Sequence, residues 1–115
     1  MKEINITLNN LDNQKWKNQV LNNLKQDIIN ELKSSNINKA NINIYTTSRK
    51  QDLVNIKENN NSNPTIKILL TSNLDVKFIM EALAKVDDIC NIDKDTAFLT
   101  KRIIHVLKSK QKEIV

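Results

Sequence analysis

Cys90 and His105 are the only cysteine and the only histidine of the chain. A thiol beside an imidazole can act as a nucleophile, because the imidazole can accept the thiol proton. A buried, apolar cysteine and a histidine on the surface of the next helix explain the two residues more simply. One cysteine and one histidine are also too few for the usual four-ligand zinc site. We therefore predict no catalytic residue, no metal site and no cofactor.

Four aspartates lie in the same part of the chain, and they are Asp87, Asp88, Asp93 and Asp95. Carboxylates can hold Mg²⁺ or Ca²⁺, but this spacing does not match a calcium-binding loop, which also needs a glycine at its sharp turn. Asp93 or Asp95 fits the N-cap of a following helix, where the side chain accepts a backbone N–H. Capping is the better interpretation, and we predict that the protein is not an enzyme.

The chain contains no glycine. Phosphate-binding loops, Rossmann turns and nucleophile elbows depend on glycine, because their backbone takes positive φ angles or approaches a ligand closely. These nucleotide-binding and hydrolase motifs are therefore excluded. Asparagine tolerates the left-handed conformation better than other residues, so we expect it at turns and helix ends, at Asn36, Asn60, Asn73 and Asn91.

The positive charge is concentrated near the C-terminus. The formal net charge is +5, and residues 94–115 hold 6 basic residues against 2 acidic ones. A basic helix is predicted at about 95–112, with an apolar stripe at Leu99, Ile103, Val106 and Leu107. The basic residues on its outer side form a surface that we call the basic ridge: Lys101, Arg102, His105, Lys108 and Lys112. A solvated helix face, an acidic protein partner and nucleic-acid phosphates all remain open as interpretations, because charge alone does not choose among them.

Three apolar side chains lie off the apolar faces of their predicted elements: Tyr45, Leu69 and Phe98. They could form an exposed contact surface for a partner or for a second copy. Alternatively, the second helix or the segment at 50–57 covers them.

The pattern of the remaining residues predicts the elements. Alternating Ile and Leu predict strands at about 2–8, 40–47 and 65–71, and residues 52–57 could add another. Helical spacing predicts helices at about 12–34, with Trp16 on the buried face, at 72–89, with Leu83 directed inward, and at 95–110. The fold class is therefore α+β: a small sheet of three or four strands with helices on one face, in the approximate order β-α-β-(β)-β-α-α.

The length of 115 residues fits a single domain over 1–115. No apolar run is long enough to cross a membrane. The N-terminus lacks the pattern of a secretory signal and Cys90 has no disulfide partner, so we expect a cytoplasmic protein.

These observations favour a non-catalytic protein-binding, adaptor or regulatory module that uses a sheet surface and the basic C-terminal helix on an acidic protein partner. The alternative is an accessory protein that binds nucleic acid by contacting phosphates through that helix. A homodimer is compatible with both functions, because a small sheet leaves edges that a second copy can close.

Overall fold

The computed structural model describes residues 3–56 and 65–114. In chain order they form β1 (Glu3–Asn10), α1 (Lys15–Ser34), β2 (Lys39–Thr46), the 3-10 helix η1 (Lys50–Asn55), β3 (Ile66–Thr71), α2 (Val76–Leu83), β4 (Asp88–Asn91) and α3 (Thr96–Ile114). The α+β class is confirmed. No helix of the described residues is long and apolar enough to span a membrane.

The strands form one four-stranded sheet in the order β1-β2-β3-β4, and every neighbouring pair is parallel. β1, β2 and β3 lie where their alternating apolar residues predict them. Their β-branched side chains fit a pleated, buried surface. The register pairs Ile6 with Ile42 and Ile44 with Ile68, so the isoleucines of adjacent strands line the same face of the sheet.

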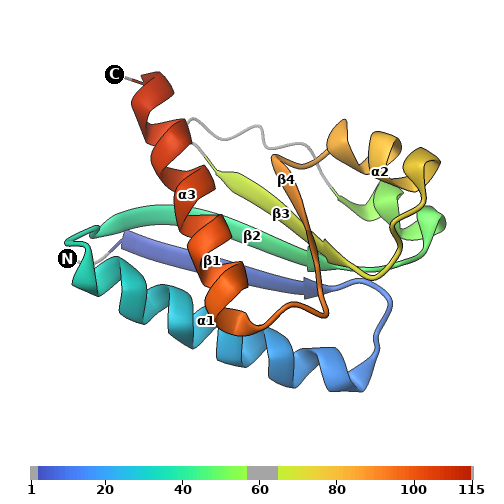
Figure 1. Ribbon diagram of the computed structural model, residues 1–115, viewed down its shortest axis with the longest axis horizontal. Coiled ribbons are helices and arrows are strands. Elements are labelled where there is room, and N and C mark those ends of the chain that lie inside the picture. The colour runs from blue at the N-terminus through green and yellow to red at the C-terminus, as the bar shows by residue number, and fades with distance from the viewer. Residues whose placement is uncertain (1–2, 57–64, 115) are drawn as a thin grey trace.

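Helices cover both faces of this sheet, whereas the sequence predicts them on one face (Figure 1). α1 and α3 pack on the first face, over the isoleucines and over Leu70 and Cys90. η1 and α2 pack on the second face, where Leu53 and Phe78 contact the side chains that alternate with the first set. Parallel sheets usually have both faces covered, because the connections between their strands must cross the sheet.

The segment after β3 differs most from the prediction. The single helix predicted at 72–89 is instead the short helix α2 followed by β4. Leu83 ends α2 and is 52% exposed, although its spacing predicts an inward position. The fourth strand is therefore β4, and residues 50–55, which overlap the optional strand, form η1.

The crossovers of the sheet differ in hand. The connections β1-α1-β2 and β3-α2-β4 advance in the same direction across the sheet but lie on opposite faces. Two such connections must have opposite hands, so one of them is of the uncommon left-handed kind. The N-terminal and C-terminal helices nevertheless pack side by side on one face (Figure 1).

Helix α1 buries its predicted leucine and isoleucine stripe, but not Trp16. Trp16 is 53% exposed, and the neighbouring Lys17 is buried in its place. Lys17 turns inward because its ammonium group meets the carboxylate of Asp12.

Asparagines supply the left-handed residues of this glycine-free chain. Among the described residues, the positive φ angles belong to Asn13 (56°) and Asn36 (58°). Asn36 was predicted, whereas Asn60 lies outside the described residues. Asn73 and Asn91 keep negative φ, and each accepts a backbone N–H two residues ahead through its side-chain oxygen. They make turns by this hydrogen bond instead.

Candidate binding surfaces

The basic ridge is only partly available to a partner. Lys101, His105 and Lys108 are exposed on α3. Arg102 donates two hydrogen bonds to Asp88 of β4, from Nε to Oδ2 at 2.6 Å and from Nη2 to Oδ1 at 3.1 Å. The side chain of Lys112 lies outside the described residues. The ridge therefore presents fewer free cations than its sequence indicates.

Tyr45, Leu69 and Phe98 do not form one exposed surface. Tyr45 is 6% exposed and Leu69 is fully buried in the second core, beneath η1 and α2. Phe98 is half exposed on α3, which packs on the other face of the sheet, and Lys94 lies over its ring. The predicted contact surface is wrong for Tyr45 and Leu69 because the second face of the sheet is covered.

Cys90 lies in the first core beside Asp88, with the sulfur 3.8 Å from Oδ2. Burial and the negative charge of Asp88 raise the pKa of the thiol to about 12. The thiol therefore stays protonated near neutral pH, and a protonated thiol is a poor nucleophile. In the part of the chain that the structure describes, the thiol hydrogen-bonds to Asp88 and not to His105, which is exposed on α3.

Three of the four aspartates, Asp87, Asp88 and Asp95, make separate side-chain contacts. Asp95 caps α3 by accepting the N–H of Phe98 at 2.8 Å, as predicted for one of the two capping candidates. Asp87 accepts the N–H of Lys67 and pairs with Lys110. Within residues 3–56 and 65–114, no three His, Cys, Asp or Glu side chains gather closely enough to hold a metal ion.

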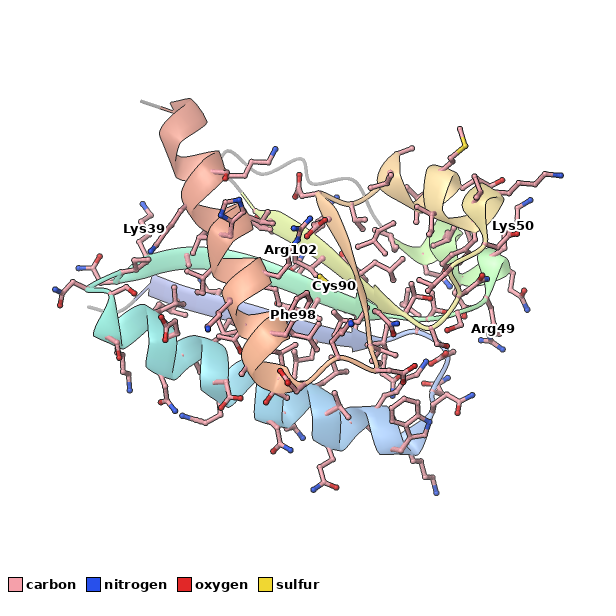
Figure 2. All side chains as sticks on the ribbon, viewed as in Figure 1. Lys39, Arg49, Lys50, Cys90, Phe98 and Arg102 are labelled. Carbon is pink, nitrogen blue, oxygen red and sulfur yellow. The ribbon has the colours of Figure 1, made fainter. Side chains whose placement is uncertain are left out.

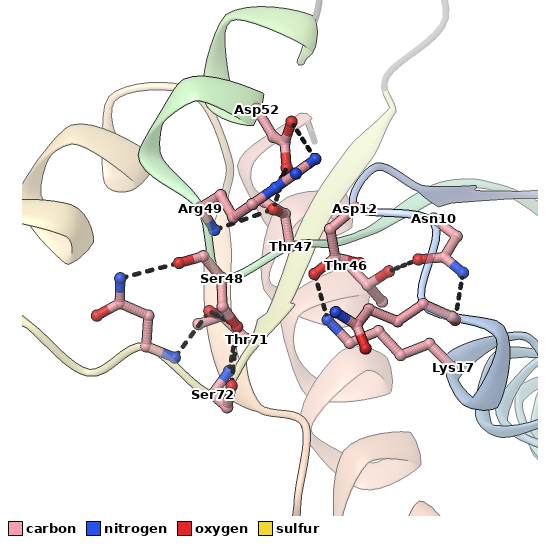
Figure 3. Close-up of polar contacts among 12 residues, drawn as sticks. Asn10, Asp12, Lys17, Thr46, Thr47, Ser48, Arg49, Asp52, Thr71 and Ser72 are labelled. Carbon is pink, nitrogen blue, oxygen red and sulfur yellow. Dashed lines mark hydrogen bonds and ion pairs between the residues drawn. The ribbon is translucent and has the colours of Figure 1, made fainter.

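The carboxyl ends of β1 and β2 bring a set of polar side chains together (Figure 3). The chain leaves these two neighbouring strands toward opposite faces of the sheet, and ligands of parallel sheets often bind at such a point. Here the backbone groups at the two strand ends bond to each other, because the N–H of Leu11 donates to the carbonyl of Thr46. Thr46 also donates to the side chain of Asn10 at 3.0 Å.

A buried ion pair lies at the same end of the sheet. Lys17 Nζ is 2.6 Å from Asp12 Oδ2, and both side chains are 4% exposed. The second oxygen, Asp12 Oδ1, is buried and has no hydrogen-bond partner in the described residues. Removing two charges from water is costly, so this pair depends on close contact between its partners.

Asp52 organises the turn into η1. It accepts from the hydroxyl of Thr47 at 2.6 Å and from Arg49 Nε at 2.8 Å. The hydrogen bond with Arg49 is the largest cause that lowers the pKa of Asp52, and the bond from Thr47 also lowers it. The nearby hydroxyls of Ser48, Thr71 and Ser72 bond to one another. These hydrogen bonds pair the polar side chains with one another and hold the segment between β2 and η1 in place.

An exposed apolar stripe covers the outer side of α2. Val76 is 69% exposed, Met80 68% and Leu83 52%, and Leu74, just before the helix, is 58% exposed. Positions 76, 80 and 83 lie on one side of a helix because their spacing matches its period. We call these four residues the α2 stripe. Large exposed apolar groups gathered in one place are typical of a contact surface.

A groove of about 580 Å³ lies between η1 and α2. Leu53 and Val54 form its η1 side, and Ala84 belongs to the α2 side. Val54 is 74% exposed. On a helical wheel Ala84 follows Met80 on the side of the groove, so the α2 stripe and the groove adjoin.

Charged residues border the groove and include Lys50, Glu81 and Lys85. Lys50 Nζ lies 3.1 Å from Glu81 Oε1, which ties η1 to α2 across the groove. Figure 2 shows Lys50 in this region, well away from Phe98 and Arg102 on α3. Lys77, one turn before Glu81 on α2, is also exposed.

Sequence reasoning missed the α2 stripe because it expected a longer helix with Leu83 directed inward. The sequence did contain a signal, because residues 74–83 carry apolar side chains around more than half of the helix circumference. A helix that packs on one side can bury only part of them.

Comparison of the chain with protein-family models, curated proteins and solved structures finds no match in any of the three.

Proposed function

We propose that the protein is a non-catalytic protein-binding module that acts through the α2 stripe and the adjoining groove. The observation that carries the proposal is the exposure of Leu74, Val76, Met80 and Leu83 in one place. Among the described residues, α1 and α3 each expose a single large apolar side chain, Trp16 and Phe98. Each such side chain in water forgoes about 1 to 2 kcal/mol of burial free energy. A partner that covers them gains this free energy on binding.

The expected partner surface is acidic. Lys50, Glu81 and Lys85 line the groove, which leaves an excess of one positive charge, and Lys77 is exposed one turn before Glu81 on α2. Negative charge on the partner would raise the association rate and would favour acidic partners over other proteins with apolar surfaces. The sheet surface expected from the sequence is replaced in this proposal by the outer side of α2, since both sheet faces are covered.

A capture experiment with matched variants tests the proposal. The immobilised protein is exposed to an extract of the cells that produce it, and captured proteins are quantified, purified and titrated against each variant. The double variant Val76→Ser/Met80→Ser removes apolar surface from α2. Trp16→Ser/Phe98→Ser removes apolar groups of similar exposure elsewhere. We expect the first variant to bind at least about tenfold more weakly and the second to bind normally. Equal binding by both variants would contradict the proposal.

A second candidate is nucleic-acid binding through Lys101, His105 and Lys108, which remain exposed on α3. Phosphate contacts by these residues would weaken steeply with salt. Fluorescence anisotropy of labelled duplex and single-stranded DNA and RNA at about 50 and 200 mM salt measures this. Salt-sensitive binding that Lys101→Glu/Lys108→Glu abolishes would establish this candidate. No binding at the lower salt would remove it.

A further inference from the structure

We infer, on the basis of the proposed function, that the partner segment is an amphipathic helix with acidic residues beside its apolar stripe, seated along α2 in the groove beside η1. The inference adds the shape and the charge of the partner to the proposed binding surface. It rests on the form of the groove, the position of the apolar side chains and the charges that border them.

The surface has the form of a helical docking site. The α2 stripe and the groove lie along two short helical elements, and the groove between them is lined partly by Leu53, Val54 and Ala84. A ridge of side chains on a partner helix packs into such a groove, with apolar anchors at i, i+3 or i+4, and i+7. An added β-strand would instead use the free edge of β1 or of β4, and neither belongs to this surface.

The charges select an acidic helix. Glu81 of α2 and Lys85, which follows the end of α2, line the groove, and the exposed Lys77 lies one turn before Glu81 on the same helix. Glu81 is already paired with Lys50. The excess charge beside the groove is therefore positive, and carboxylates on the partner helix would compensate for it.

The same charge disfavours a second copy of this chain as the occupant. Two copies would bring together surfaces that share the excess of lysine beside the groove. Like charges at an interface oppose association. An acidic partner removes this repulsion.

Synthetic peptides of defined sequence test the inference directly. The first is a helix-forming peptide of about 16 residues with leucines at helical spacing and glutamates beside them. The second has the same leucines with lysines in place of the glutamates, and the third has the composition of the first in an order that destroys the apolar face. Each is titrated into ¹⁵N-labelled protein, and amide chemical shifts report both the affinity and the location of binding.

We expect the acidic amphipathic peptide to shift amides of α2 and η1 and to bind at least about tenfold more tightly than either other peptide. Lys77→Glu/Lys85→Glu should reverse the preference between the acidic and the basic peptide, whereas Lys33→Glu on α1 should leave it unchanged. Circular dichroism of each variant verifies the fold. All these lysines are exposed, so their substitution leaves the cores intact.

The outcomes separate this inference from the proposed function. If no peptide binds, or if the third peptide, which lacks an apolar face, binds as tightly as the first, the inference of a helical partner is wrong. If the basic peptide binds more tightly, or the charge reversal has no effect, the acidic partner is wrong. In either case a natural partner that still depends on Val76 and Met80 would leave the proposed function standing. Sedimentation that shows a dimer dependent on Met80 would replace the acidic helix with a second copy.

Discussion

Arg102 of α3 and Asp88 of β4 form a bidentate ion pair that joins the last helix to the edge strand of the sheet. The carboxylate is 13% exposed and the guanidinium 51% exposed. The planar fork of arginine matches the two oxygens of a carboxylate, which lysine cannot do. This contact links α3 to β4 and pairs one cation of the basic ridge.

Replacement of Arg102 should therefore destabilise the fold. Arg102→Gln leaves the mostly buried carboxylate of Asp88 without its partner, and we expect the free energy of unfolding to fall by about 1 to 2 kcal/mol. Lys101→Gln, at the exposed neighbouring position, should change it by less than about 0.5 kcal/mol. Urea unfolding followed by circular dichroism measures both, and equal effects would show that the ion pair contributes nothing.

The buried pair of Asp12 and Lys17 should show strong coupling. Lys17→Met leaves the Asp12 carboxylate buried without a counter-charge, which should lower the free energy of unfolding by about 3 kcal/mol. Adding Asp12→Asn should recover part of this loss, because no unpaired charge then remains. A double-mutant cycle by urea unfolding gives the coupling free energy, with Lys15→Met as the exposed control. Additive effects would mean that the two charges do not interact.

Asp52 should make stability depend on pH in the acid range. The hydrogen bond from Arg49 is the main cause that lowers the pKa of Asp52 in the folded state. The unfolded chain therefore takes up the proton first, at about pH 4. The stabilisation is complete above that pH and is lost as the pH falls through the lowered pKa of the folded state. The difference in unfolding free energy between wild type and Asp52→Asn should shrink between about pH 5 and pH 2.

Substitution of Arg49 provides the control for this pH dependence. Arg49→Gln removes the guanidinium that lowers the pKa of Asp52, so the acid sensitivity should weaken in this variant. Urea unfolding at several pH values would record it. An unchanged pH profile in both Asp52→Asn and Arg49→Gln would show that other groups control acid unfolding.

Leu69 and Phe98 should differ in their importance for stability. Leu69 is fully buried in the second core, and Leu69→Ala should cost about 2 to 5 kcal/mol because it leaves a cavity. Phe98 is 50% exposed, and Phe98→Ala should cost clearly less. Thermal unfolding compares the two. A tolerant Leu69 would mean that η1 and α2 do not cover the second face.

Cys90 should be unreactive while the protein is folded. Burial and Asp88 raise the pKa of its thiol to about 12, so very little thiolate is present at pH 8. A colorimetric thiol reagent should therefore label the folded protein slowly and the urea-unfolded protein at once. Rapid labelling without urea would show that the thiol is accessible.

The amino-acid sequence by itself determined β1, β2, β3 and the approximate positions of α1 and α3. It predicts about 12–34 for α1, which spans Lys15–Ser34, and about 95–110 for α3, which spans Thr96–Ile114. Apolar residues in strict alternation, such as Ile4 and Ile6, predict a strand with one face toward the core, as β1 has. The lack of glycine determined that asparagine would supply the left-handed residues, as Asn36 does. These features depend on residues close together in the chain, so they can be predicted without knowledge of the fold.

Only the tertiary structure decided β4, the burial of Tyr45 and Leu69, and the exposure of the α2 stripe. The short segment Asp88–Asn91, with only Ile89 and Cys90 as apolar residues, fits a helix or a strand equally well until a neighbouring strand provides its hydrogen bonds. Whether an apolar side chain is a core residue or a contact surface depends on which element packs over it. That choice is made between residues far apart in the chain, as when Arg102 meets Asp88 and α2 covers Leu69 while leaving Met80 in water.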